Sequence, residues 1–223
     1  MKAIIFDMDG VIVDSELQWM NCSREFFKRI LPHWKESDNH KIVGLAVEDL
    51  YHWLVDEYSL TQEKHEFLKE CHAIADRVYK ECTSLAPGIK ELFHNARRLE
   101  IPLGLASSSP RAWIETTLQR FALKDFFKAV VSADDVPSGR TKPHPDLYLL
   151  AASRLDVRPE DCLAIEDSFR GLCAAKAARC VAAGLRNGHN DEQNLTAADF
   201  ELRGFTGLTC EGLAAKTGTS RNS

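Results

Sequence analysis

The stretch IIFDMDGVIVDSE, residues 4–16, decides the fold, because its short apolar run stops at two aspartates and a glycine. Such a run, with no polar alternation, is typical of a strand buried on both faces of a parallel sheet. Burying Asp7 close to Asp9 is costly unless a cation compensates the charge. The end of this strand therefore requires a metal ion, a proton or a chemical task.

Four further apolar runs share this character, at residues 103–106, 129–131, 162–165 and 180–183. Between them, apolar residues recur at helical spacing, as over residues 89–99 and 147–155. Alternating strands and helices predict an α/β fold with a doubly wound, Rossmann-like parallel sheet. In such a sheet the functional site lies at the carboxyl ends of the strands.

Residues 16–83 break this alternation, since they carry helical patterns and no convincing strand. Trp19, Cys22, Phe26 and Ile30 share one helical face. We predict an all-helical cap domain at 16–83, inserted into a catalytic core of residues 1–15 and 84–223. Because the cap leaves and re-enters beside the first strand end, it is placed to close over that end.

Hydroxyl groups and one lysine follow the later strands. Ser107 and Ser108 come directly after the run at 103–106, where hydroxyl and backbone N–H groups could hold phosphate oxygens. Ser109, before Pro110, is expected to cap the next helix instead. Lys142 lies in a loop stiffened by two prolines, and its ammonium group could neutralise both a phosphate and a carboxylate.

Two acids, Glu166 and Asp167, end the run at 162–165. Together with Asp7 and Asp9 they offer an all-oxygen ligand set, which suits Mg²⁺. Each feature alone has an ordinary structural explanation, such as a helix-capping acid or a solvated loop lysine. Acid, hydroxyl, amine and acid at the ends of different strands nevertheless converge in space on this architecture. We therefore expect them to form one site.

Four ordered segments of the chain resemble the four motifs of the haloacid dehalogenase superfamily. They are Asp7-Met8-Asp9-Gly10, Ser107, Lys142 and Glu166-Asp167-Ser168. The resemblance covers nearly the whole chain, including a helical cap inserted after the first motif. It is specific for the superfamily and says little about the substrate.

This resemblance implies a role for each matching residue. Asp7 would be the nucleophile that forms an aspartyl-phosphate and would also face the metal. Asp9 would be the general acid and then the general base, with its backbone carbonyl on Mg²⁺. Lys142 and Ser107, with Ser108 adjacent, would bind the phosphoryl group. The remaining metal ligands would be Asp167 and, in or beside the coordination shell, Glu166.

The cap resembles that of the β-phosphoglucomutase branch and its phosphatase relatives. Asp9 already separates the chain from the dehalogenases of the superfamily, which lack an acid there. Mutases of the branch carry His at the position of Trp19 and Arg at that of Val47, three residues after the position of Gly44. The resemblance therefore favours sugar-phosphate phosphatases, such as those acting on 2-deoxyglucose 6-phosphate. Trp19 becomes a candidate substrate contact, with a packed core aromatic as the alternative.

We accordingly predict a Mg²⁺-dependent hydrolase of a small sugar or polyol phosphate. The alternatives are a hexose-phosphate mutase, a phosphatase for nucleotide-like or pseudouridine-type monophosphates, and a cap-and-core scaffold without turnover. Three polar cap residues, Arg24, His40 and Lys41, are not singled out by their spacing, and His144 is interpreted as a packing or capping residue.

Composition limits the partners of the protein. The formal net charge of −5 argues against a nucleic-acid partner. No apolar stretch reaches the length that spans a bilayer, and the chain starts without a signal-peptide pattern. Seven cysteines without a CxxC pair predict reduced, mostly buried thiols in a cytoplasmic protein. We expect a monomer or weak dimer.

Overall fold

A computed structural model describes residues 1–35, 38, 41–42 and 45–219. Six parallel strands form one sheet in the order β3-β2-β1-β4-β5-β6. Their bounds are β1 Ala3–Phe6, β2 Leu103–Ala106, β3 Phe127–Val131, β4 Cys162–Glu166, β5 Val181–Leu185 and β6 Phe200–Leu202. The predicted runs coincide with β1 to β5 to within two residues, whereas β6 was not predicted.

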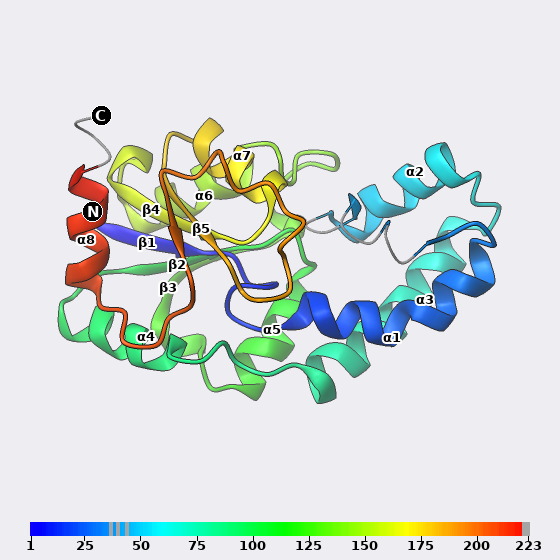
Figure 1. The fold of residues 1–223 in the computed structure, drawn as a ribbon, viewed down its shortest axis with the longest axis horizontal. Coiled ribbons are helices and arrows are strands. Elements are labelled where there is room, and N and C mark those ends of the chain that lie inside the picture. Colours follow the sequence, from blue (N-terminus) through cyan, green and yellow to red (C-terminus); the bar gives the residue numbers. More distant parts are fainter. Residues whose placement is uncertain (36–37, 39–40, 43–44, 220–223) are drawn as a thin grey trace.

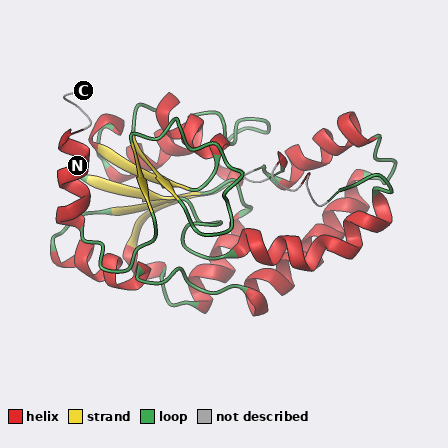
Figure 2. Ribbon diagram, viewed as in Figure 1, coloured by secondary structure: helices red, strands yellow, loops and turns green. Residues whose placement is uncertain are grey.

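Helices cover both faces of the sheet, which confirms the doubly wound fold (Figure 2). Ile4 and Phe6 face one apolar cluster, and the alternate residues Ala3 and Ile5 face the other. The first cluster includes residues of α4 (Ile89–Arg98), α5 (Arg111–Arg120) and α8 (Cys210–Thr219). The second includes residues of α6 (Asp146–Leu155) and α7 (Phe169–Ala177). The short helical segments η3 Lys124–Phe126, η4 Ala133–Asp135 and η5 Pro159–Asp161 lie in connections.

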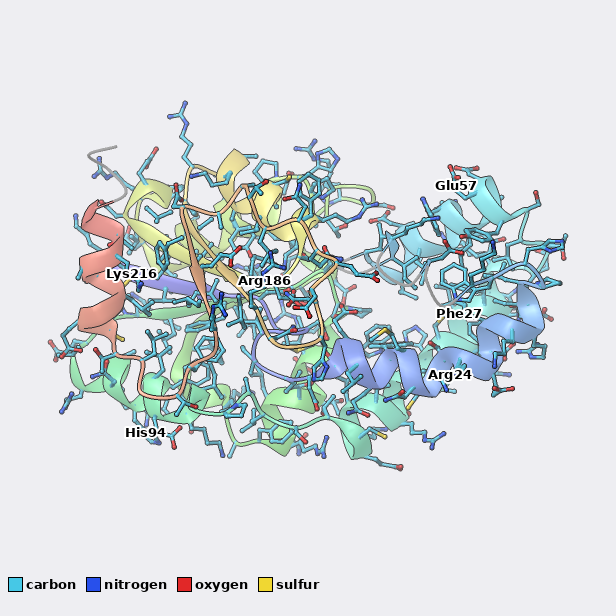
Figure 3. All side chains as sticks on the ribbon, viewed as in Figure 1. Arg24, Phe27, Glu57, His94, Arg186 and Lys216 are labelled. Carbon is cyan, nitrogen blue, oxygen red and sulfur yellow. The ribbon has the colours of Figure 1, made fainter. Side chains whose placement is uncertain are left out.

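The segment after β1 forms a separate group of helices that extends from the core (Figure 1). It comprises α1 Ser15–Ile30, α2 Val47–Tyr58, α3 Lys64–Arg77 and the π-helical segment η2 Val78–Cys82. No strand occurs in the described part of residues 16–83. These helices share their own apolar cluster, in which Phe27 of α1 lies on the side toward α2 (Figure 3). The boundaries of a core and a cap domain stay a prediction, and we call this group of helices the cap below.

The cap contacts the core at several points around the carboxyl edge of the sheet. Thr141 donates a hydrogen bond of 2.8 Å to Asp49 in α2, and the Trp113 indole in α5 approaches His72 in α3 at 3.3 Å. Arg120 donates to the backbone carbonyl of Tyr79 in η2. These contacts hold the cap over the strand ends.

Two further findings concern the whole described chain. No described helix combines the length and apolarity needed to cross a membrane. All seven cysteines are free thiols and four of them are buried, which confirms the prediction of mostly buried thiols.

Candidate active site

Three buried carboxylates meet where β1 and β4 end. One oxygen from each of Asp7, Glu166 and Asp167 lies within 4.8 Å of the others. The strand register causes this, because Phe6 pairs with Ile165, which places Asp7, directly after β1, beside Glu166, the last residue of β4. Oxygen ligands at such spacing suit a hard divalent cation. We call these three residues the acidic cluster.

The acidic cluster carries more negative charge than the protein around it balances. Burial raises the pKa of Asp7 well above its ordinary value, and the neighbouring charge of Glu166 adds to this while Lys142 opposes it. Burial also raises the pKa of Asp167, with further contributions from Glu16 and Asp7. A carboxyl group that resists ionisation in this way gains from a bound cation.

Lys142 is the cation that the fold itself supplies to the acidic cluster. Its Nζ lies 2.6 Å from both Asp7 Oδ1 and Glu166 Oε1, and its side chain is 1% exposed. Burial alone would lower the pKa of Lys142, but the attraction of the two carboxylates outweighs burial and raises it. One ammonium group facing three carboxylates leaves room for a further positive charge.

Two glycines let backbone approach the acidic cluster closely. A Cβ on Gly10, where φ is +70°, would lie 1.9 Å from Asp167 Oδ2, and a Cβ on Gly171 would lie 2.0 Å from Glu166 Oε2. Asn187 donates hydrogen bonds of 3.0 Å to Asp167 Oδ2 and to the carbonyl oxygen of Gly10. Sequence reasoning missed Asn187, although its place two residues beyond β5, at the same sheet edge, was an available signal.

The carboxylate of Asp9 lies outside the acidic cluster. Oδ1 accepts hydrogen bonds from Ser15 Oγ at 2.6 Å and from the Tyr79 hydroxyl at 2.7 Å. Oδ2 accepts from Ser109 Oγ at 2.7 Å and from Ser107 Oγ at 3.2 Å. Four hydroxyl groups thus hold this side chain. Metal binding through the Asp9 backbone carbonyl stays a prediction.

The serines after β2 differ from one another in their surroundings. Ser107 is fully buried, donates to Asp9 and accepts a hydrogen bond from the Ser109 N–H at 3.0 Å. The expectation that Ser109 caps α5 is wrong, because its hydroxyl points to Asp9 and no side chain caps that helix. Ser108 Oγ is buried without a partner among the described residues and borders the cavity described next. The phosphate-binding roles of Ser107 and Ser108 stay predictions, and Ser108 offers the free donor.

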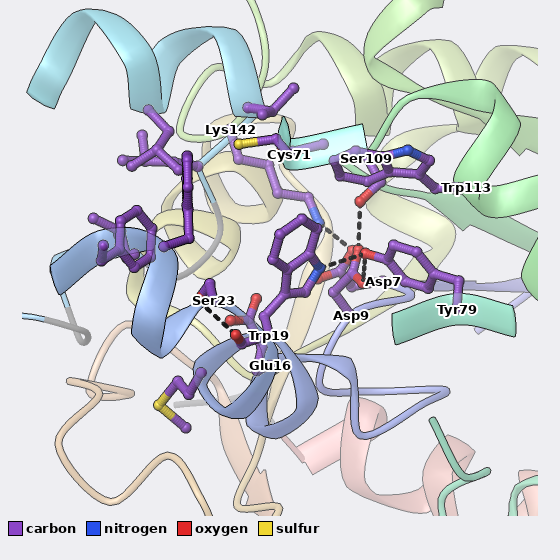
Figure 4. Close-up of a pocket in the computed structure, with 18 residues that line it drawn as sticks. Asp7, Asp9, Glu16, Trp19, Ser23, Cys71, Tyr79, Ser109, Trp113 and Lys142 are labelled. Atoms are coloured by element: carbon purple, nitrogen blue, oxygen red, sulfur yellow. Dashed lines mark hydrogen bonds and ion pairs between the residues drawn. The ribbon is translucent and has the colours of Figure 1, made fainter. Parts of the chain in front are cut away.

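A cavity joins the strand ends to the cap (Figure 4). Its core end carries Asp7, Asp9, Ser108 and Lys142. Trp19 also lines the cavity, although its indole N–H is engaged, donating to the Tyr79 hydroxyl at 3.1 Å. A substrate could therefore meet the ring of Trp19 but not its N–H group.

Tyr79 links the cap to Asp9 and was missed from the sequence. It is buried in η2, and burial, together with the charge of Asp9, raises the pKa of its hydroxyl well above the ordinary value. The phenol is therefore a neutral donor to Asp9. No local sequence pattern could have found it, because Asp9 lies 70 residues away in the chain.

The other polar candidates lie away from the cavity. His144 and Arg24 are exposed, and Lys41 pairs with Asp38 at 2.7 Å on the cap surface. His40 and Gly44 lie outside the described residues. Val47, the position that the sequence resemblance singled out in the cap, lines the cavity.

Comparisons with known proteins find matches over most of the chain. A family model described as haloacid dehalogenase-like hydrolase matches residues 4–185. Hexitol phosphatase B of Escherichia coli K12 is 32% identical, covering 95% of this chain and 96% of that protein. Beta-phosphoglucomutase of Bacillus subtilis is 33% identical, covering 95% and 93%. The crystal structure of CbbY from Rhodobacter sphaeroides in complex with xylulose-(1,5)bisphosphate superposes with a TM-score of 0.82, at 25% identity, covering 96% and 99%.

Proposed function

Because the chain belongs to the haloacid dehalogenase-like hydrolases, we propose that it is a phosphatase that hydrolyses a small sugar or polyol phosphate with Mg²⁺ as its cofactor. The observation that carries the proposal is the meeting of Glu166 and Asp167 with Asp7 and Lys142, the two residues that line one end of a cavity. The donor set fits the ion, since it consists of buried carboxylate oxygens with excess negative charge. Asp7, Glu166 and Asp167 would hold Mg²⁺, which when bound offsets charge on the phosphoryl oxygens.

The residues of the chain divide the reaction into two steps. A carboxylate oxygen of Asp7 attacks phosphorus, and the bond from phosphorus to the alcohol oxygen breaks as Asp9 donates a proton to that oxygen. Water then attacks the phosphorus of the aspartyl-phosphate and gives its proton to Asp9. Phosphate leaves and Asp7 is restored. Lys142 contributes a fixed positive charge beside the attacking carboxylate, which lowers the repulsion between two anions.

Mutase activity is the second candidate, since a relative of similar identity is a β-phosphoglucomutase. A mutase must hold a second phosphate in the cap while the intermediate reorients. Among the described residues that line the cavity, Lys142 is the sole basic side chain, and it belongs to the phosphoryl end. Val47 and Trp19 offer no charge to a second phosphate. This favours hydrolysis over transfer.

Phosphate release from a panel of sugar, polyol and nucleotide monophosphates, with Mg²⁺ or with EDTA, tests the proposal. We expect Mg²⁺-dependent release of free phosphate and no turnover by Asp7→Asn, whose amide is not a nucleophile. Circular dichroism of that variant controls for folding. Retention of phosphate on an isomerised sugar, primed by a bisphosphate, would instead identify a mutase. Wild-type rates in Asp7→Asn would remove the proposed nucleophile.

A further inference from the structure

The two ends of the cavity differ sharply in polarity. The phosphoryl end is formed by charged and hydroxyl groups of the core. The remainder of the lining, which the alcohol part of a substrate would meet, consists mainly of apolar or sulfur-bearing side chains. They are Trp19, Met20, Phe26, Phe27, Ile42, Leu45, Val47, Leu50, Cys71 and Trp113. We call this set the apolar wall.

Polar atoms near the apolar wall are already engaged. Ser23 Oγ donates to the backbone carbonyl of Trp19 at 2.6 Å. The indole N–H of Trp19 donates to Tyr79, and that of Trp113 approaches His72 Nδ1 at 3.3 Å. Neither indole N–H group can donate to a substrate hydroxyl without losing its present partner, and Ser23 Oγ, whose proton is engaged, can only accept.

The remaining polar side chains on the cap side add little hydrogen-bonding capacity. Burial, with a smaller contribution from Glu70, raises the pKa of the Cys71 thiol to about 12, so it is a neutral, weak donor. Glu16, in the first turn of α1, lines the cavity outside the apolar wall, and its carboxylate can only accept hydrogen bonds. Among the described residues, the apolar wall offers the leaving alcohol packing surface rather than hydrogen-bond partners.

We propose that the leaving alcohol of the substrate carries an apolar ring with few hydroxyl groups, such as a deoxygenated sugar or another ring alcohol. The proposal rests on the proposed hydrolysis and narrows its substrate class to ring esters, which sets the polyol phosphates aside. A hydroxyl buried without a partner is penalised, and hydrophobic sites discriminate against an added hydroxyl by about 10-fold to 100-fold. The rings of Trp19 and Trp113, with centroids 5.4 Å apart, give the wall flat faces that suit a ring.

Matched phosphate esters test this inference directly. Cyclohexylmethyl phosphate and glucose 6-phosphate both place a six-membered ring beside a primary phosphate, so their leaving groups differ mainly in hydroxylation. Sorbitol 6-phosphate provides the open-chain polyol. We expect kcat/KM to be at least about tenfold higher for cyclohexylmethyl phosphate than for glucose 6-phosphate, with sorbitol 6-phosphate lowest. Equal values, or a preference for either hydroxylated ester, would overturn the inference.

A pair of variants on one helix ties the preference to the apolar wall. Val47→Thr places a hydroxyl in the cavity, while Val55→Thr makes the same change at a position on α2 that is 36% exposed and does not line it. The preference is the kcat/KM for cyclohexylmethyl phosphate divided by that for glucose 6-phosphate. We expect Val47→Thr to reduce this ratio about threefold or more, because the new hydroxyl can pair with a hydroxyl of glucose 6-phosphate. Val55→Thr should leave that ratio unchanged. An unchanged ratio in Val47→Thr would assign the preference to another surface.

The outcomes for the inference and for the proposed function are distinct. Efficient hydrolysis of sorbitol 6-phosphate in preference to the ring esters would leave the phosphatase standing and overturn the apolar substrate. Absence of Mg²⁺-dependent phosphate release from all three esters and from p-nitrophenyl phosphate would overturn the phosphatase itself. If Val47→Thr fails to fold, the ratio measured on the wild-type protein decides the inference alone.

Discussion

Replacing Lys142 with methionine tests the charge balance of the site through stability alone. Lys142 Nζ lies 2.6 Å from two buried carboxylate oxygens, those of Asp7 and Glu166. Removing one partner of a buried ion pair costs about 3–5 kcal/mol, because it leaves an uncompensated charge. Since one ammonium group serves both carboxylates, we expect about 4–5 kcal/mol near neutral pH without a divalent ion. For a chain of this length that corresponds to a Tm lower by about 8–20 °C.

The free energy of unfolding that Lys142→Met loses should become smaller as the pH falls. Burial, followed by repulsion from Glu166, raises the pKa of Asp7 well above 3.8 in the folded protein. Between the unfolded and folded pKa values the folded state binds more protons, so the free energy of unfolding increases as pH decreases. Without Lys142 the group that opposes this shift is absent. The variant should therefore gain more stability than the wild type between about pH 7 and pH 5.

Urea unfolding in EDTA at both pH values measures these changes, and Lys80→Met is a matched control. Lys80 pairs with Asp76 at 3.0 Å, but the two side chains are 55% and 64% exposed. An exposed pair of this kind contributes at most about 1 kcal/mol, with little change over this pH range. Two results would refute the charge balance described for the acidic cluster. One is that Lys142→Met lowers the free energy of unfolding no more than Lys80→Met does. The other is that Lys142→Met lowers it by the same amount at both pH values.

Three further predictions concern the metal and Asp9. Mg²⁺ at about 100 times its Kd should raise the free energy of unfolding by about 2.7 kcal/mol near neutral pH. In Asp167→Asn, thermal unfolding should show little of this stabilisation by Mg²⁺. Equal stabilisation of that variant would argue against the metal site. Gly10→Ala should also lose the stabilisation by Mg²⁺, because the new Cβ would lie 1.9 Å from Asp167 Oδ2. Full retention of that stabilisation would contradict this prediction. Tyr79→Phe removes one of the four hydroxyl groups that orient Asp9 and should lower kcat/KM about tenfold for alkyl phosphates but little for p-nitrophenyl phosphate, whose leaving group needs no acid. Equal losses on both substrates would mark Tyr79 as a packing residue.

The core strands could be predicted from the sequence because their signals are local. Continuous apolar runs identify β1 to β5, and helical spacing identifies the stripes of α4 and α6. The edge strand β6 has three residues with Glu201 in the middle, which is too short a pattern to separate from a loop. The expectation for Ser109 failed because a tertiary partner, Asp9, competes with the helix end for its hydroxyl.

The strand-end residues of the site could be predicted for a different reason. Parallel strands carry their carboxyl ends to one edge, so Asp7, Glu166 and Asp167 come together whatever lies between them in sequence. Tyr79 reaches Asp9 from 70 residues away through a π-helical turn, and no sequence pattern marks that contact. The apolar wall was equally hidden, since a helical apolar stripe looks the same whether it faces a core or a cavity.

Covalent trapping is the sharpest test of Asp7 as the nucleophile. Asp9→Asn should accumulate the aspartyl-phosphate during a single turnover of p-nitrophenyl phosphate, because it lacks the base for the second step. Mass spectrometry after acid quenching should then find one phosphoryl group on the peptide that contains Asp7, and none when Asp7→Asn is added. A phosphoryl group on another residue, or release of phosphate at the wild-type rate by the Asp7→Asn variant, would contradict the mechanism.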